Sequence, residues 1–115
     1  MGQIAMKLPV RFTRTSSREL HRIADWYNDQ ISGLGEKWLQ GIQKTMASLS
    51  ENPDRFGLAH EVDSFPYELH ELYYGVGRRK THRVLFRMTK EEVVILGIRH
   101  TSQQNATPED LWNTE

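Results

Sequence analysis

The stretch RRKTHRVLFRMTKEEVVILGIRH, residues 78–100, indicates the fold class of this chain more clearly than any other. Residues 83–88 alternate between two sets, Arg83, Leu85 and Arg87 against Val84, Phe86 and Met88. This is the two-residue period of a β-strand with two different faces. Residues 93–98 (VVILGI) are apolar almost throughout, which is typical of a central strand. The short polar segment at 89–92 (TKEE) predicts a turn, so the whole stretch predicts a β-hairpin.

The charge of this hairpin contrasts with that of the segment before it. Residues 51–71 carry six acidic residues and one arginine, whereas residues 78–100 carry seven basic residues and two glutamates. If Val84 and Phe86 pack on a core, Arg83 and Arg87 face the other, open side of the sheet. Such a basic face could hold a polyanion, with a merely solvated strand face as the competing interpretation.

Two amphipathic helices are expected before the hairpin. Residues 8–14 predict a short first strand, and Ser16 with Glu19 forms a capping box that would start a helix over about 16–31. After a break at Ser32-Gly33, the apolar spacing predicts a second helix over about 34–50. Because so short a break joins them, the two helices predict an αα-hairpin.

The remaining segments complete one domain over residues 1–115, with a core over about 8–100. Residues 52–66 predict a loop and residues 67–74 a strand. In the tail, Thr107, Pro108 and the acids after them predict a short helix over 107–113. The order β-α-α-β-β-β-(α) predicts an α+β fold in which the helical hairpin packs on an antiparallel-rich sheet.

Composition excludes several function classes. The chain has 115 residues and no cysteine, which excludes disulfides and thiolate catalysis. Its formal net charge of zero argues against a general nucleic-acid coat protein. The five histidines show no metal-ligand spacing, so neither a metal site nor another cofactor is expected. No window resembles a membrane span or a signal peptide, and we expect a cytoplasmic protein with no membrane partner.

Three stretches together resemble the RelE/ParE family of toxins from bacterial type II toxin–antitoxin systems. FTRTSSRELHRIADWYND (12–29) resembles the family's first strand and first helix, and HRVLFR (82–87) resembles its third strand. VVILGIRHTSQQNATPEDL (93–111) resembles the last strand and the Arg-His ending of the plasmid-stabilisation branch. The resemblance implies a toxin that a cognate antitoxin neutralises. RelE-like members cleave mRNA on the ribosome, whereas ParE-like members inhibit DNA gyrase without cutting RNA.

The resemblance also implies roles for residues if the chain cleaves RNA. Such cleavage needs a base, an acid and cations against the charge that develops on the phosphate. Arg83 matches the strand arginine that RelE-like members use on the scissile phosphate, and Arg99 is a second phosphate contact. His100 lies near the position of the residue that protonates the leaving group. In the competing interpretations, Arg83 pairs with a carboxylate such as Glu71, the stem of Arg99 is buried, and His100 caps the strand or contacts the antitoxin.

The base is the point at which this chain departs from the RelE-like pattern. Those members often carry lysines in the second strand, and residues 67–74 contain none. Glu61, Glu71 or His70 would have to serve instead. This departure leaves the target open between the ribosome and gyrase.

Two further surfaces are expected. The basic run Arg78-Arg79-Lys80, together with Arg87, predicts a nucleic-acid contact, with solvated charges as the alternative. Trp26 falls beside the core stripe of the first helix and is predicted to pack against an antitoxin helix.

Our leading hypothesis is a toxin that cleaves mRNA on the ribosome through Arg83, Arg99 and His100. The alternatives are a ParE-type gyrase inhibitor that binds without catalysis, and a member that retains only antitoxin binding. We expect the Arg83 and His100 side chains to distinguish among them, since only RNA cleavage would need both.

Overall fold

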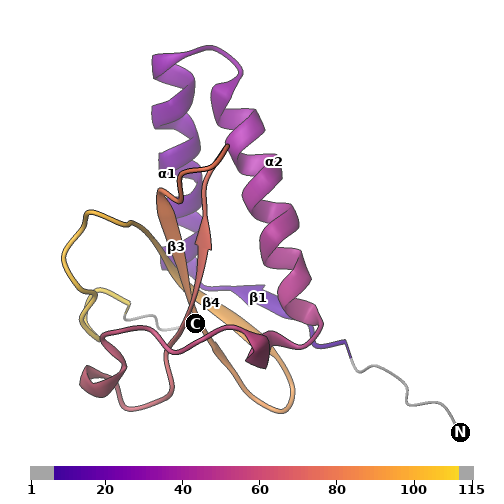
Figure 1. Cartoon of the computed structure of the whole chain (residues 1–115), viewed down its shortest axis with the longest axis vertical. Coiled ribbons are helices and arrows are strands. Elements are labelled where there is room, and N and C mark those ends of the chain that lie inside the picture. Colours follow the sequence, from indigo (N-terminus) through magenta and orange to yellow (C-terminus); the bar gives the residue numbers. More distant parts are fainter. Residues whose placement is uncertain (1–6, 112–115) are drawn as a thin grey trace, which may run out of the picture.

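A computed structural model describes residues 7–111 and confirms the α+β architecture (Figure 1). Two helices and four strands make up the fold: β1 (Val10–Phe12), α1 (Arg14–Gln30), α2 (Leu34–Ala47), β2 (His70–Tyr74), β3 (His82–Met88) and β4 (Val93–His100). The strand order is β1-β4-β3-β2. β1 runs parallel to β4, and the β2–β3 and β3–β4 pairs are antiparallel.

The start of α1 differs from the prediction because another residue caps it. The Thr13 side chain accepts a hydrogen bond from the backbone N–H of Ser16 at 3.2 Å, so α1 begins at Arg14. The expected Ser16–Glu19 capping box is therefore wrong. Glu19 instead accepts the N–H of Ile98 at 2.9 Å. That N–H lies on the edge of β4 beyond the end of β1, and Glu19 satisfies it.

The helical hairpin forms as predicted, with tight packing at the turn. Gly33 adopts a left-handed conformation (φ +87°), which glycine tolerates and which lets the chain reverse. The Asn28 side chain accepts the N–H of Gly35 at 2.7 Å, so the end of α1 fixes the start of α2. α2 ends at Ala47, and the last predicted residues form a separate 3₁₀ turn, Ser48–Ser50.

The main core lies between the helical hairpin and one face of the sheet. Its buried side chains come from both helices, from the 3₁₀ turn after α2 and from three strands: Leu20, Ala24, Trp38, Ile42, Met46, Leu49, Leu72, Val84, Phe86, Val93, Ile95 and Ile98. The parity predicted for β3 holds, since Val84 and Phe86 face the helices.

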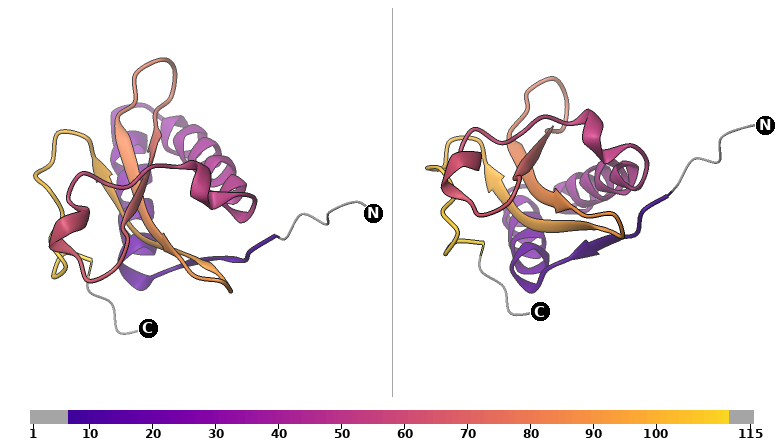
Figure 2. Two further views of the ribbon diagram at one scale, coloured as in Figure 1. Left: turned by 60° about the horizontal axis from the view of Figure 1, so that its bottom comes forward. Right: turned by 90° about the horizontal axis from the view of Figure 1, so that it is seen from below.

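A second core covers the other face of the sheet, which was expected to be open. The segments 53–66 and 101–111 lie across it (Figure 2). They enclose Ala59, Phe65, Leu69, Leu85, Val94, Leu96, Ala106 and Leu111. Two 3₁₀ turns, Pro53–Arg55 and Val62–Ser64, shape the first segment. The expectation of an exposed basic sheet face is therefore wrong.

A bulge changes the parity of β4. The β3–β4 register pairs Leu85 with Gly97 but Phe86 with Ile95, which leaves one extra residue in β4. Arg99 consequently pairs with Arg83 and shares its face, rather than the face of Val93 and Ile95 that uninterrupted alternation implies.

Two strands are shorter than predicted, and the tail differs from the predicted helix. The first strand covers Val10–Phe12, and the strand expected over 67–74 begins at His70. Residues 108–111 form consecutive turns, so the predicted helix is absent over the part that the structure describes; residues 112 and 113 lie outside it. No helix among residues 7–111 combines the length and the apolar character that crossing a lipid bilayer requires.

Candidate functional site

Arg83 extends from the middle of the sheet into a pair of carboxylates. Its side chain is only 3% exposed, and its two terminal nitrogens donate to both oxygens of Glu61 at 2.7 and 2.6 Å. A third hydrogen bond reaches Glu71 Oε1 at 3.1 Å. This arrangement matches the competing interpretation of an ion pair with Glu71, to which Glu61 adds a bidentate contact. The guanidinium therefore faces carboxylates in this structure and not an open surface.

Glu61 connects three segments of the second core. Besides Arg83, its carboxylate accepts the backbone N–H of Ala106 at 2.7 Å, and the neighbouring His60 contacts Asn105 at 2.5 Å. Burial opposes ionisation of Glu61, but the hydrogen bonds from Arg83 and Ala106 outweigh it and lower the pKa of the carboxyl to about 2. Glu61 thus holds the 53–66 segment, β3 and the tail together as an anion.

The same cluster contains three groups of the kind that bind metals. Ligand atoms of His60, Glu61 and Glu71 lie within 4.8 Å of one another, a grouping that the spacing of histidines along the chain did not indicate. The Arg83 guanidinium already supplies a cation to both carboxylates. An added metal ion would meet that charge, and the cluster is better described as an internal ion-pair network.

The other two arginines of β3 and β4 are also engaged. Arg99 is largely buried, donates to the carbonyl of Gln104 at 2.8 Å and lies 4.0 Å from Asp110. Arg87 is half-buried, with its guanidinium 4.4 Å from the centre of the Tyr67 ring. Arg87 lines a cavity of about 450 Å³, together with Arg11, Thr13, Pro66, Tyr67, Thr89, Glu92, Val94, Leu96, Pro108 and Leu111.

His100 is exposed at the end of β4 and belongs to an aromatic cluster. Its Nδ1 accepts hydrogen bonds from the backbone N–H and the hydroxyl of Ser102, so the ring caps the turn after the strand. The His82 ring lies 5.2 Å away, edge to face. Burial lowers the pKa of His82 to about 4, and the neighbouring His100 adds to this effect, so His82 is neutral at pH 7.

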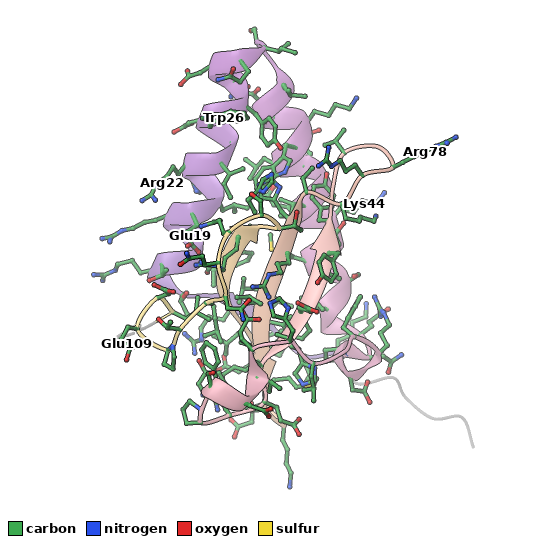
Figure 3. All side chains as sticks on the ribbon, turned by 60° about the vertical axis from the view of Figure 1, so that its left-hand side comes forward. Glu19, Arg22, Trp26, Lys44, Arg78 and Glu109 are labelled. Carbon is green, nitrogen blue, oxygen red and sulfur yellow. The ribbon has the colours of Figure 1, made fainter. Side chains whose placement is uncertain are left out.

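A groove of about 430 Å³ opens beside these histidines, on the side of the molecule formed by α1. Trp26 is 57% exposed at its rim and packs edge to face on Tyr27. Trp26 lies on α1 one turn after Arg22, whose side chain points away from the molecule (Figure 3). The groove is lined by Ile23, Trp26, Tyr27, His82, His100 and Ser102.

The structure thus separates the residues that the sequence grouped together. Arg83 and Arg99 share one face of the sheet, whereas His82, the register neighbour of His100, faces the helices. Arg78, Arg79 and Lys80 are exposed on the β2–β3 loop, at the end of the sheet where His82 pairs with His100. From the sequence, Glu61 was considered only as a possible base and not as a partner of Arg83. Their contact spans 22 positions and depends on how the intervening segment folds.

The model of the family described as "ParE toxin of type II toxin-antitoxin system, parDE" matches residues 10–105. The chain belongs to the ParE toxin family. This match spans every strand and helix of the fold. No curated protein sequence matches the chain significantly.

Two solved structures of toxin–antitoxin systems share the fold of this ParE-family toxin. The chromosomal ParDE system from P. aeruginosa contains a chain with a TM-score of 0.65 and 22% identity, covering 84% of this chain and 98% of that one. The RelBE2 toxin–antitoxin complex from Mycobacterium tuberculosis contains one with a TM-score of 0.57 and 27% identity, covering 89% and 100%. The expected membership of the RelE/ParE group is therefore confirmed.

Proposed function

We propose that this ParE-family toxin inhibits DNA gyrase by binding and does not cleave RNA. The observation that carries the proposal is the match of the ParE toxin model over residues 10–105. Ribosome-dependent mRNA cleavage, the leading hypothesis from the sequence, becomes the alternative, and the likeness to the RelBE2 complex favours it.

The state of the sheet arginines supports a binding mechanism. Cleavage through a neighbouring 2′-hydroxyl requires a cation that can meet the phosphate while charge develops on it. Arg83 gives three hydrogen bonds to carboxylates, and Arg99 is turned toward the tail. To reach a phosphate, Arg83 would have to leave a buried bidentate pair, which is strongly unfavourable. His100 alone remains exposed among the three residues expected to cleave.

The antitoxin is the second partner in the proposal, since both structural relatives are toxin–antitoxin systems. We assign it the groove beside α1, because an exposed tryptophan next to an apolar hollow is typical of a protein-binding anchor. Trp26 would form its rim, with Ile23 and Tyr27 as its walls. His100 would then contact the antitoxin, as one of the interpretations of the sequence has it.

A paired assay separates the two mechanisms. Purified toxin is added to bacterial DNA gyrase with relaxed plasmid, and separately to a cell-free translation reaction whose mRNA is mapped by primer extension. We expect loss of supercoiling and an intact message. His100→Ala is included because its side chain is exposed and the variant should fold.

Either result is informative. Supercoiling that continues in excess toxin, with new cuts in translated codons that disappear in His100→Ala, would replace the proposal by the RelE-type mechanism. Loss of supercoiling that persists in His100→Ala supports inhibition by binding.

A further inference from the structure

The loop between β2 and β3 forms a cationic tip. It contains Arg78, Arg79 and Lys80, all exposed, and projects past the end of the sheet (Figures 1 and 2). Arg78 points away from the body of the molecule (Figure 3). Gly77 has a left-handed conformation (φ +82°), so the chain turns sharply just before the three cations and presents them together.

Helix α2 adds two lysines to the same end. Tyr74, the last residue of β2, crosses α2 at Gly41, where its hydroxyl occupies the space that a side chain would need and donates to the carbonyl of Trp38 at 3.4 Å. Lys37 and Lys44 lie one turn before and one turn after Gly41 and are both exposed. The loop that carries the other three cations begins directly after this crossing. The five cations therefore share one region of the surface.

These five cations have no close carboxylate partner in the part of the chain that the structure describes. Within residues 7–111, none of the five cations makes an ion pair of 4.0 Å or less with an acidic side chain. The acids nearest to them along the chain contact other groups: Glu36 accepts from Asn28 on α1, Glu51 lies 3.5 Å from Lys7, and Glu71 accepts from Arg83. In a chain with a formal net charge of zero, this concentration of positive charge is local.

We propose that the cationic tip, defined as Lys37, Lys44, Arg78, Arg79 and Lys80, binds the phosphate backbone of duplex DNA. Arginine and lysine on a projecting loop are the groups that neutralise phosphates, and such contacts need no base recognition. Val76 is the one large apolar side chain exposed on the β2–β3 loop. An apolar protein surface is therefore a less suitable partner for this loop than DNA. This inference rests on the proposed function in one respect: the DNA would be the duplex that gyrase holds.

Fluorescence anisotropy with a labelled 20-base-pair duplex tests the tip directly, without gyrase. The variant Arg78→Gln/Arg79→Gln/Lys80→Gln is compared with Arg18→Gln/Arg22→Gln/Lys90→Gln, which removes the same charge from exposed positions on α1 and the β3–β4 turn. We expect the tip variant to lose roughly tenfold or more in affinity at low salt. The slope of log K against log salt should fall in magnitude by about 2 to 3, since each lost phosphate contact removes about 0.9. The control variant should keep the slope of the wild type.

Equal losses in the two variants would reduce the effect to net charge and overturn the proposal. Tighter, tip-dependent binding to a single-stranded RNA of equal length would overturn the assignment to DNA. A toxin that inhibits gyrase while its tip variant binds DNA unchanged would contradict this inference alone. A toxin with tip-dependent DNA binding and no effect on gyrase would contradict the proposed function alone.

Discussion

Arg83 retains its charge inside the protein because two carboxylates come to it from different segments. Removing a guanidinium from water is unfavourable unless its donors find partners, and here the two terminal nitrogens donate three hydrogen bonds to Glu61 and Glu71. The hydrogen bonds that Arg83 donates to Glu61 also raise the pKa of the guanidinium. The pair therefore fixes the 53–66 segment against the sheet and depends on both partners staying charged.

The first prediction concerns the pH dependence of this pair. The pKa of Glu61 is lowered from 4.5 to about 2 by Arg83 and Ala106 against the opposing effect of burial. A carboxyl with a lowered folded pKa stabilises the protein above its unfolded pKa, and the contribution is lost as pH falls from about 4.5 through about 2. A shift of this size corresponds to about 3 kcal/mol. Glu61→Gln should lose about that much stability at pH 7 and should weaken less than the wild type between pH 6 and pH 3.

Urea unfolding followed by circular dichroism at several pH values measures this effect. Glu92→Gln serves as the control, because Glu92 also makes a bidentate pair with an arginine, Arg11, but at the surface. Its effect at pH 7 should be much smaller. If Glu61→Gln unfolds at the urea concentration of the wild type at pH 7, the buried pair does not hold the segment.

The sequence could predict those features of this site that depend on local pattern, but not those that depend on how distant segments fold. Strand parity placed Arg83 opposite Val84 and Phe86 correctly, because parity needs only local alternation. Whether that face was open depended on residues 53–66 and 101–111, whose irregular backbone has no period to interpret. The accessibility of Arg83 therefore could not follow from its own strand.

At the scale of secondary structure elements, the helical hairpin depends on a close approach at Gly35. A Cβ at this position would lie 2.1 Å from the backbone oxygen of Ala24 and 2.5 Å from the Asn28 side chain. The backbone of α1 cannot yield without moving the helix. Gly35 therefore allows the two helices to meet where the chain reverses.

The second prediction is that Gly35→Ala destabilises the fold. Helix propensity alone would favour alanine by about 1 kcal/mol, whereas the clash with α1 should produce a net loss of about 1 to 3 kcal/mol. Gly57→Ala is the matched control, since nothing lies within 4 Å of the position and its φ is not positive. Thermal and urea unfolding of both variants measure the difference. A Gly35→Ala variant as stable as the wild type would show that the helices can separate without loss.

The elements themselves were more predictable than their junctions. Helical spacing and strand alternation gave α1, α2, β3 and β4 within a few residues. The β4 bulge was missed because VVILGI contains apolar residues on both faces, so a shift of one residue leaves no trace in the pattern. The tail is held by contacts that its own sequence does not show: Glu61, 45 positions away, accepts the N–H of Ala106, and Arg99 donates to the carbonyl of Gln104.

At the scale of the whole molecule, the two surfaces assigned to partners use different physical interactions. The groove beside α1 offers an exposed aromatic rim, whereas the cationic tip offers charge. Neither uses the arginines of the sheet, which stabilise the fold. A toxin of this design would separate recognition of its antitoxin from contact with DNA, and variants of one surface should leave binding at the other unchanged.

The third prediction tests the antitoxin surface. Trp26→Ala should weaken binding of the cognate antitoxin by about thirtyfold or more, the size expected for an aromatic anchor that the partner covers. The stability of the toxin alone should change little, because the side chain is 57% exposed. Isothermal titration calorimetry with purified antitoxin measures the affinity. Ile31→Ala is the control, since Ile31 is 64% exposed at the end of the same helix but does not line the groove. Equal losses for Trp26→Ala and Ile31→Ala would mean that the antitoxin covers the end of the helical hairpin, and the groove would no longer be its anchoring site.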